Sequence, residues 1–467
     1  MKKRLALSLA LLAGLVMGAT SANAADIKAA GSWKIDAGWS GHNYFGANTN
    51  LNRDQKTFSI DQRIRTAFQF IANENLKGVM EIQFGPAAWG NDGLAVTQNG
   101  GGATNGNGNI KVRKAYVDFN WPGTKNRFLV GHQSLSLPST FGGGSAILDH
   151  HFSAAAAIVP VTDNISLVGG YARLLDDDGN GYVATTNGNG SSIDAAFLYS
   201  DLKFTGFNIQ PFAAFAYGGA NAINGSNLVG MLAPNGSGAD GIRSYWAGAA
   251  FTMTALDPFK VTADLNYGKA TNNNGNTVDG GRSGWLGDIA VDYTGLSMMT
   301  PSLFFAYTSG EDDDAGKSER MPVVAAQNWA VGSFFMQNGN IGAAINTNNT
   351  PATALGFWAA GLSLKDIKLI DKLSHSFHVI YFKGNNDEAN VGRANFGTYG
   401  QVLTEKDSLW EVDLNSTYKI YEELALGLEL GYIFNNYDKD VWAASANDRD
   451  NIDKNAYKAV LEVTYSF

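Results

Sequence analysis

The 467-residue sequence contains no cysteine and few charged residues. Without cysteine, a disulfide-stabilised scaffold and a thiolate metal site are both excluded. Asp, Glu, Lys and Arg make up only 16% of the chain, against roughly 25% in ordinary soluble domains. The net charge is −9 and no basic block interrupts the acidic balance. Nucleic-acid binding is therefore not expected, because phosphate contacts need clustered Lys and Arg.

Long hydrophobic runs are also missing after the first 24 residues, so a protein that crosses a membrane with helices is not expected. The first 24 residues have the three parts of a secretory signal peptide. These parts are a basic start at residues 2–4, an apolar stretch at 5–19 and an Ala-x-Ala cleavage site at 22–24. We predict a signal peptide at 1–24 and a single mature domain at 25–467 that leaves the cytoplasm.

The remainder of the chain is rich in glycine and aromatic residues, and its apolar residues recur at every second position. From 424 to 434, Leu, Tyr and Phe occupy alternate positions, with Ala, Gly and Glu at most positions between them. Residues 457–467, 260–267, 288–293 and 63–70 repeat this pattern. Alternation with period two is typical of a β-strand that has one apolar and one polar face.

The connectors between these strands come in two alternating lengths. Short connectors lie at 73–75, 121–124, 160–164 and 421–423. Long connectors rich in Gly, Asn and Asp lie at 86–109, 174–191, 218–241, 270–284, 310–353, 385–406 and 436–455. Long loops at one end and tight turns at the other are the layout of an outer-membrane β-barrel.

This layout predicts an all-β fold, namely a transmembrane antiparallel up-and-down β-barrel. We count about eighteen strands, with sixteen as the alternative, and either even number places both termini on the periplasmic side. A closed sheet pairs all its backbone groups without exposed edges, as lipid requires. A soluble propeller or sandwich would also alternate, but it would not need so uniformly apolar and aromatic an outer face.

A barrel of this width leaves an aqueous channel, whereas a barrel of about eight strands is filled by side chains. We therefore predict a porin for passive diffusion of ions and small hydrophilic solutes, with no catalytic residues and no enzyme activity. One alternative is a solute-specific channel for a sugar or an organic acid or anion with aromatic side chains along its lumen. Trp329, Trp358, Trp410 and Trp442 either line such a path or belong to the aromatic girdles. A second alternative is a surface barrel that acts as an enzyme or an adhesin.

Segment 134–153 is the one long connector that is not plainly polar. An apolar loop needs a surface to pack against, so we expect it to fold inward and to narrow the pore, with an ordinary outer loop or a subunit contact as the alternatives. If the apolar residues of the neighbouring strands face lipid, four cations face the lumen, and the segment brings one carboxylate opposite them. The candidate constriction residues are thus Arg63, Arg65, Lys114, Arg127 and Asp149.

Opposite charges across a narrow lumen create a transverse field that favours ions and small dipolar solutes. The alternative is that these cations pair with Asp61, Glu81 and Asp118 along the wall and only make it rigid.

Asp176, Asp178 and Asn180 have the spacing of the first half of an EF-hand loop, in which alternate carboxylates chelate calcium. The twelfth position of such a loop should be Glu and is Asn187 here. A solvated outer loop is therefore the favoured interpretation, with calcium as the alternative, and no other cofactor is expected.

Six short segments of the N-terminal third resemble the outer-membrane homotrimeric porins of sulfate-reducing bacteria, a family of the Gram-negative general-porin type. These segments are 28–33 (KAAGSW), 62–66 (QRIRT), 74–78 (ENLKG), 112–118 (VRKAYVD), 131–133 (GHQ) and 137–139 (LPS). The strong part of the resemblance covers about residues 25–150. The final strand, ending at Phe467, is similar to the strand that the barrel-assembly machinery recognises.

The resemblance implies a water-filled homotrimer in the outer membrane. Its implied partners are outer-membrane lipid and lipopolysaccharide, the barrel-assembly machinery, and small hydrophilic solutes and ions.

Overall fold

The computed structural model describes residues 25–43, 45, 57–90, 110–175, 192–219, 241–272, 281–314, 316–326, 329–335, 356–393, 396–397, 399–446 and 453–467. The predicted signal peptide and the calcium candidates Asp176, Asp178 and Asn180 lie outside these residues. The described chain is almost entirely β-structure, with a short 3-10 helix η4 (Glu388–Asn390) and one α-helix, α4 (Lys439–Ala446). None of the helices in the described part is long and apolar enough to cross a membrane.

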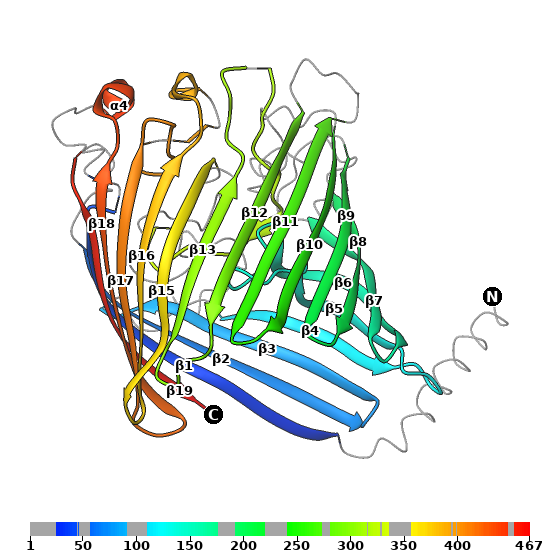
Figure 1. Ribbon diagram of the computed structural model, residues 1–467. Helices are drawn as coiled ribbons and strands as arrows, with labels where there is room; N and C mark the ends of the chain where they lie inside the picture. Colours follow the sequence, from blue (N-terminus) through cyan, green and yellow to red (C-terminus); the bar gives the residue numbers. More distant parts are fainter. Residues whose placement is uncertain are drawn as a thin grey trace.

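The strands form one antiparallel sheet that closes on itself (Figure 1). They are β1 (Asp26–Gly41), β2 (Thr57–Asn73), β3 (Leu76–Ala88), β4 (Ile110–Asn120), β5 (Arg127–Ser136), β6 (Leu148–Thr162), β7 (Ile165–Leu175), β8 (Ile193–Phe204), β9 (Phe207–Gly218), β10 (Ile242–Leu256), β11 (Phe259–Asn272), β12 (Arg282–Tyr293), β13 (Thr300–Thr308), β14 (Ala325–Ala326), β15 (Phe357–Ile370), β16 (Leu373–Gly384), β17 (Ser408–Lys419), β18 (Leu424–Asn436) and β19 (Ala456–Ser466).

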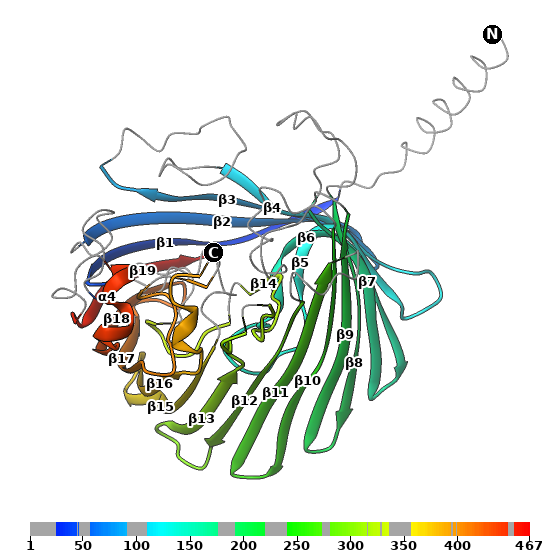
Figure 2. The ribbon, with the colours of Figure 1, turned by 90° about the horizontal axis from the view of Figure 1, so that it is seen from above.

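Each wall strand pairs with the next along the chain, and β1 pairs with β19 to close the ring. The short β14 is different, because it pairs in parallel with the first residues of β6 and lies inside the ring in the view from above (Figure 2). Of the 19 strands in the sheet, β14 is thus not part of the wall. The other eighteen form the barrel, which confirms the predicted fold class and the higher of the two strand counts.

The two ends of the barrel differ as the sequence predicts. Short turns join β2 to β3, β4 to β5, β6 to β7 and β17 to β18, where the sequence predicts the short connectors. The chain enters β1 and leaves β19 at this same end, and the longer connections lie at the opposite end (Figure 1). In an outer-membrane barrel the short-turn end is periplasmic and the long-loop end is extracellular.

The outer surface carries two bands of aromatic side chains with an aliphatic zone between them. Near the short turns, the ring centroids of Phe204 and Phe207 lie 4.9 Å apart, and those of Phe259 and Tyr293 lie 5.3 Å apart. Near the long loops, Phe215 contacts Tyr245 at 5.1 Å and Tyr267 contacts Trp285 at 4.6 Å. Between the bands, aliphatic side chains such as Leu198, Leu265 and Leu303 are more than half exposed. Such girdles mark the two interfaces of a lipid bilayer.

The buried apolar side chains lie inside the barrel, where long connections fold inward. Ile147 between β5 and β6, and Val323, Phe334 and Phe335 between β13 and β15, are almost fully buried. They belong to one cluster with wall side chains that include Trp246, Phe357, Ile380, Phe382 and Leu409. These connections therefore fill part of the lumen with a packed core, to which the wall strands from β5 round to β19 contribute side chains.

Candidate functional site

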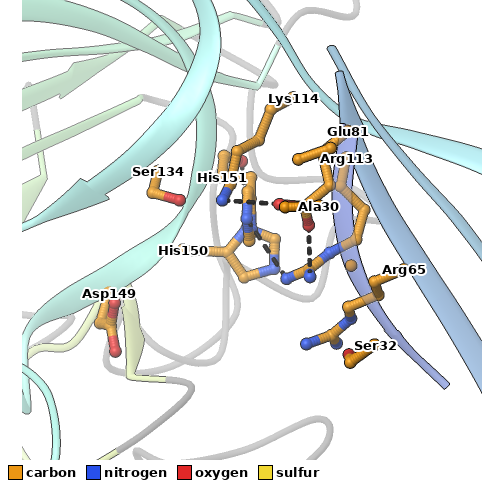
Figure 3. A pocket seen from close by; sticks show the side chains of 12 residues that line it. Ala30, Ser32, Arg65, Glu81, Arg113, Lys114, Ser134, Asp149, His150 and His151 are labelled. Carbon is orange, nitrogen blue, oxygen red and sulfur yellow. Dashed lines mark hydrogen bonds and ion pairs between the residues drawn. The ribbon is translucent and has the colours of Figure 1, made fainter. Parts of the chain in front are cut away.

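A chamber of about 500 Å³ lies between the inner face of β1–β4 and the ends of β5 and β6 (Figure 3). Its lining comes from β1–β4 on one side and from β5 and β6 on the other: Ala30, Gly31, Ser32, Arg65, Ala67, Glu81, Arg113, Lys114, Ser134, Asp149, His150 and His151. The lining includes three cationic side chains, two carboxylates and two histidines.

The chamber exists because β4 and β5 separate from each other at the extracellular end. Their pairing covers only Ala115–Asn120 of β4 and Arg127–His132 of β5. Beyond these pairs, the first residues of β4 stay with β3, while the end of β5 stays with β6. The space between the diverging strands is bounded by Arg113 and Lys114 of β4 and by Ser134 of β5.

Glu81 on β3 holds two of the cations. Its carboxylate oxygens lie 2.8 Å from Nη1 of Arg113 and 2.8 Å from Nζ of Lys114. The other guanidinium nitrogen of Arg113, Nη2, lies 3.3 Å from Nε2 of His151. Figure 3 shows both cations converging on Glu81, with His151 beside Arg113. One carboxylate thus fixes two cations against the wall by charge-assisted hydrogen bonds.

Both Arg113 and Lys114 reach Glu81 because of a β-bulge. Glu81 pairs with Lys114, but the next residue, Ile82, pairs with Val112, so Arg113 is an extra residue in β4. An extra residue breaks strict alternation and lets two consecutive side chains point to the same face. Alternation alone places Arg113 on the lipid side, so the sequence analysis missed it.

Arg65 on β2 provides the third cation. Its Nε donates a hydrogen bond of 2.8 Å to Oε1 of Gln83 on β3, and its guanidinium points towards Ser32 across the chamber wall (Figure 3). Arg63 lies two residues earlier on the same inward face of β2, just beyond the lining. Asp149 and Ser134 lie on the opposite side of the chamber, on β6 and β5.

The predicted constriction residues are therefore only partly brought together. Arg65, Lys114 and Asp149 line the chamber, and Arg63 lies beside it. Arg127 lies elsewhere, at the periplasmic end of β5, where Nε and Nη2 each donate a 2.7 Å hydrogen bond to Asp118. The alternative of pairing along the wall describes two of these cations, because Arg127 pairs with Asp118 and Lys114 pairs with Glu81. Whether Arg63, Arg65, Lys114 and Asp149 narrow the solute path stays a prediction.

The predicted inward loop is shorter than expected. Segment 134–153 includes the end of β5 and the beginning of β6, so the connection itself is 137–147 and Asp149 belongs to a strand. The assignment of Asp149 to a loop is wrong for this reason.

The inward direction of the loop is confirmed by its contacts with Asp264 on β11, on the far wall. Ser139 Oγ donates to this carboxylate at 2.7 Å, Thr140 Oγ1 at 2.8 Å, and the backbone N–H groups of Thr140 and Phe141 at 2.9 and 3.2 Å.

A second connection also folds into the lumen, and the sequence analysis missed it. The backbone N–H groups of Ser333, Phe334 and Phe335 donate to the carboxylate of Glu411 on β17, at 3.0, 3.0 and 2.7 Å. The two connections also meet, since Ala330 N donates to Gly142 O at 3.0 Å. The sequence signal was present, because the apolar stretch 321–336 interrupts an otherwise polar connector.

The four tryptophans do not form a path along the lumen. Trp358 and Trp410 contact Tyr381 at 5.4 and 4.9 Å in a cluster on the lipid side, where Trp410 is 50% exposed. Trp442 is buried in α4 and donates from Nε1 to Asp407 at 2.9 Å. Trp329 is buried between the two inward connections. The alternative as girdle residues therefore describes Trp358 and Trp410, and the aromatic path formed by all four tryptophans is wrong.

No known protein-family model and no curated protein matches the chain. Solved structures do match along nearly the whole length. OpdQ of Pseudomonas aeruginosa is 13% identical, with 95% of this chain and 98% of that chain covered and a TM-score of 0.52. The outer membrane protein OprD of the same organism is 13% identical, with 96% of each chain covered and a TM-score of 0.51.

OccK8 (OprE) of Pseudomonas aeruginosa is 12% identical, with 95% of this chain and 98% of that chain covered and a TM-score of 0.52. At such identities the likeness concerns the fold. The chain is a multi-pass antiparallel barrel that resembles outer-membrane porins.

Proposed function

We propose that the protein is an outer-membrane channel for passive diffusion of small hydrophilic solutes, and that it prefers anions. The observation that carries the proposal is the basic chamber against the inner face of β1–β4, in a closed barrel whose outer surface has the girdles and aliphatic zone of a lipid-facing wall. An eighteen-strand wall encloses more space than its own side chains fill. The inward connections pack against one part of this wall, and the chamber lies against another part.

The preference for anions follows from the charges that the chamber presents. Arg65, Arg113 and Lys114 line it together with Glu81 and Asp149, and Arg63 lies next to them on β2. Cations that line a narrow space with low-dielectric walls raise the local concentration of anions. Glu81 compensates part of this charge, so the preference should be graded rather than absolute.

A salt-gradient measurement in planar bilayers tests the proposal. We expect discrete open channels and a reversal potential of the anion-selective sign. The double variant Arg65→Gln/Arg113→Gln should move the reversal potential towards zero. The matched variant Arg127→Gln removes a cation that is paired with Asp118 outside the chamber, and it should have a smaller effect. A silent bilayer would overturn the channel, and cation selectivity of the wild type would overturn the anion preference.

The solute-specific alternative is narrowed by the position of the tryptophans. The described lining of the chamber has no Phe, Tyr or Trp, so stacking on sugar rings has no support there, whereas an organic anion has cations to bind. In liposome swelling, small organic anions should enter faster than uncharged sugars of the same size. Equal rates would favour a channel without selectivity for solute charge.

A further inference from the structure

Arg65 differs from the other two cations of the chamber in the group that holds it. Arg113 and Lys114 each form an ion pair with Glu81. Arg65 forms no ion pair with a carboxylate in the part of the chain that the structure describes. Its Nε donates instead to the neutral amide oxygen of Gln83, at 2.8 Å. The charge of Arg65 is therefore the least compensated of the three and acts most strongly on an anion in the chamber.

Gln83 is itself held in one orientation. It is 2% exposed, and its Nε2 donates a hydrogen bond of 2.5 Å to the carbonyl oxygen of Gly85. Gly85 lies at a β-bulge in the register of β3 against β2, where a carbonyl can leave the ladder and accept from a side chain. Because a carbonyl oxygen only accepts hydrogen bonds, the amide nitrogen must face Gly85 and the amide oxygen must face Arg65.

The strand register places three polar side chains in one row across the chamber wall. Ser32 of β1 pairs with Arg65 of β2, and Arg65 pairs with Gln83 of β3. Ser32 and Arg65 line the chamber. Since Gln83 occupies Nε, the two Nη groups of Arg65 are the donors that remain, and they point to the side of Ser32 (Figure 3). Such an end-on pair of donors matches two oxygen atoms of a planar oxyanion.

We propose that Gln83 is a positioning residue that aims Arg65 into the chamber, and that the resulting site binds small planar oxyanions in preference to halides. A planar oxyanion presents two oxygens to two parallel N–H donors, whereas a halide has a single centre. Arg113 does not offer the same fork, since its Nη1 is bound to Glu81 and its Nη2 contacts His151. The inference rests on the proposed anion-preferring channel and names the anions that this channel favours.

Saturation of the single-channel conductance tests the preference for oxyanions. The probes are potassium nitrate and potassium bromide, because both anions are monovalent and weakly hydrated and only nitrate has oxygen atoms. One additional hydrogen bond is equivalent to about fivefold in affinity, so the nitrate conductance of the wild type should be half-saturated at about one fifth of the bromide concentration. Equal half-saturation concentrations would overturn the inference.

Gln83→Met tests the positioning role, because it removes the acceptor of Arg65 Nε without removing a charge. This variant should stay anion-selective in a salt gradient but lose the difference between nitrate and bromide. Gln83→Asn should do the same, since its shorter amide does not reach Arg65. Arg65→Lys should also lose the difference, because lysine keeps the charge and has no fork. Heat-modifiable migration on a gel shows that each variant is folded.

The matched control is Gln69→Met. It makes the same substitution on the inner face of β2, four residues from Arg65 and thus about 13 Å along the strand. This variant should keep the wild-type difference between nitrate and bromide. A nitrate preference that survives in Gln83→Met or Gln83→Asn would show that Gln83 does not position Arg65.

A measurement without conduction separates this inference from the proposed function. Phenylglyoxal modifies accessible guanidinium groups, and mass spectrometry of the detergent-solubilised protein gives the extent of modification at Arg65. Nitrate should protect Arg65 at about one fifth of the bromide concentration in the wild type, and at the same concentration as bromide in Gln83→Met. A silent bilayer with Arg65 protected by nitrate contradicts the channel and supports the site. Open anion-selective channels without this protection contradict the site alone.

Discussion

Glu81 decides how much positive charge the chamber shows to a passing solute. Its two oxygens each lie 2.8 Å from a cation, one on Arg113 and one on Lys114. The ion pairs hold both cations against the wall and cancel part of their field. The same contacts make Glu81 the residue at which a single change raises the charge of the chamber without removing a cation.

We predict that Glu81→Gln strengthens anion selectivity. For a monovalent ion that passes at a separation of about 7 Å, losing one negative charge changes its energy by about 0.6 kcal/mol in water, or about threefold in occupancy. The reversal potential in a salt gradient should therefore move in the anion direction. Asp118→Asn is the control, because Asp118 pairs with Arg127 outside the chamber. A shift in the opposite direction would contradict the role of the chamber.

A second residue-scale feature is the buried ion pair between Glu311 and Arg320, in the connection that follows β13. Arg320 Nε lies 2.6 Å from Glu311 Oε1, Ser318 Oγ also donates at 2.6 Å, and both charged side chains are less than 10% exposed. Burial raises the pKa of Glu311, but the charge of Arg320 and the hydrogen bonds from Ser318 and Arg320 outweigh it, so the net pKa is lowered.

We predict that acid loosens this connection. A carboxyl whose folded pKa is depressed stabilises the fold above its unfolded pKa of about 4.3, and this contribution is lost as the pH falls through the lower, folded value. Amide hydrogen exchange in 311–320, corrected for the intrinsic rate at each pH, should therefore accelerate only below pH about 4.3.

Arg320→Gln should accelerate the same exchange at neutral pH, since an unpaired buried charge costs about 3–5 kcal/mol. The exposed pair Asp314–Lys317 provides the control, and Lys317→Gln should change nothing measurable. Identical exchange in Arg320→Gln and the wild type would show that the pair does not hold the connection.

At the scale of residues, the alternation of apolar and polar positions predicted which side chains of regular strands face the lumen. Arg65 and Lys114 face the lumen because they alternate with lipid-facing residues in regular strands. Arg113 was not predictable, because no residue pattern around 112–114 marks the bulge that turns it inward. For Arg127 the prediction of an inward-facing side chain was correct, but its predicted place among the constriction residues was not. Alternation gives the face on which a side chain lies and not its position along the barrel axis.

At the scale of elements, the two inward connections depend on a few wall carboxylates. Asp264 receives its hydrogen bonds from three consecutive residues of 137–147. A hydrogen bond to a charged group contributes about 1.5–3 kcal/mol, so this one side chain can hold the connection across the lumen.

We predict that Asp264→Ala frees the connection and makes the open channel noisier, with more frequent transitions between conductance levels. Asp264→Asn keeps one acceptor oxygen and should have a weaker effect. Single-channel recording measures both. Asp292→Asn is the control. Asp292 is a carboxylate on β12 that forms an ion pair with Lys365 of β15 within the wall. Equal records for Asp264→Ala and Asp292→Asn would mean that the carboxylate does not anchor the connection.

The sequence predicted one inward connection and missed the other for a physical reason. The apolar residues of 137–147 follow a strand directly, so an inward fold is the simplest way to bury them. The apolar stretch 321–336 lies within a long connector rich in Asn and Gly. Its position depends on Glu411, about eighty residues later in the chain, and no local pattern reveals that contact.

At the scale of the whole molecule, the barrel was predictable because lipid leaves few alternatives. Every backbone group in the membrane must be paired, and the wall strands must alternate between lipid and lumen. Both requirements produce a repeated pattern in the sequence, namely alternating apolar and polar residues within each strand. Counting these strands gave the number of strands in the wall. The contents of the lumen obey no such repeat, so the packed core and the shape of the chamber could not be predicted.

Closure of the ring provides the last prediction. At the seam between β1 and β19, Gly31 N donates to Phe467 O at 2.8 Å and Phe467 N donates to Gly31 O at 3.1 Å. A Cβ at Gly31 would meet the carbonyl oxygen of Arg65 on β2 and the ring of Phe467, at 2.6 Å for the ring. Such overpacking costs about 1–3 kcal/mol. Gly31→Ala should therefore weaken the seam on which the closed barrel depends.

Gly78→Ala is a matched control on β3, where a Cβ would have its nearest neighbour at an ordinary 3.9 Å. Because Ala in a strand loses less backbone entropy on folding than Gly, this variant should be as stable as the wild type or slightly more stable. The measurement is the temperature at which the compact band on an unheated gel converts to the unfolded band. We expect this temperature to fall for Gly31→Ala only. If both variants convert at the wild-type temperature, contacts other than this seam limit the stability of the barrel.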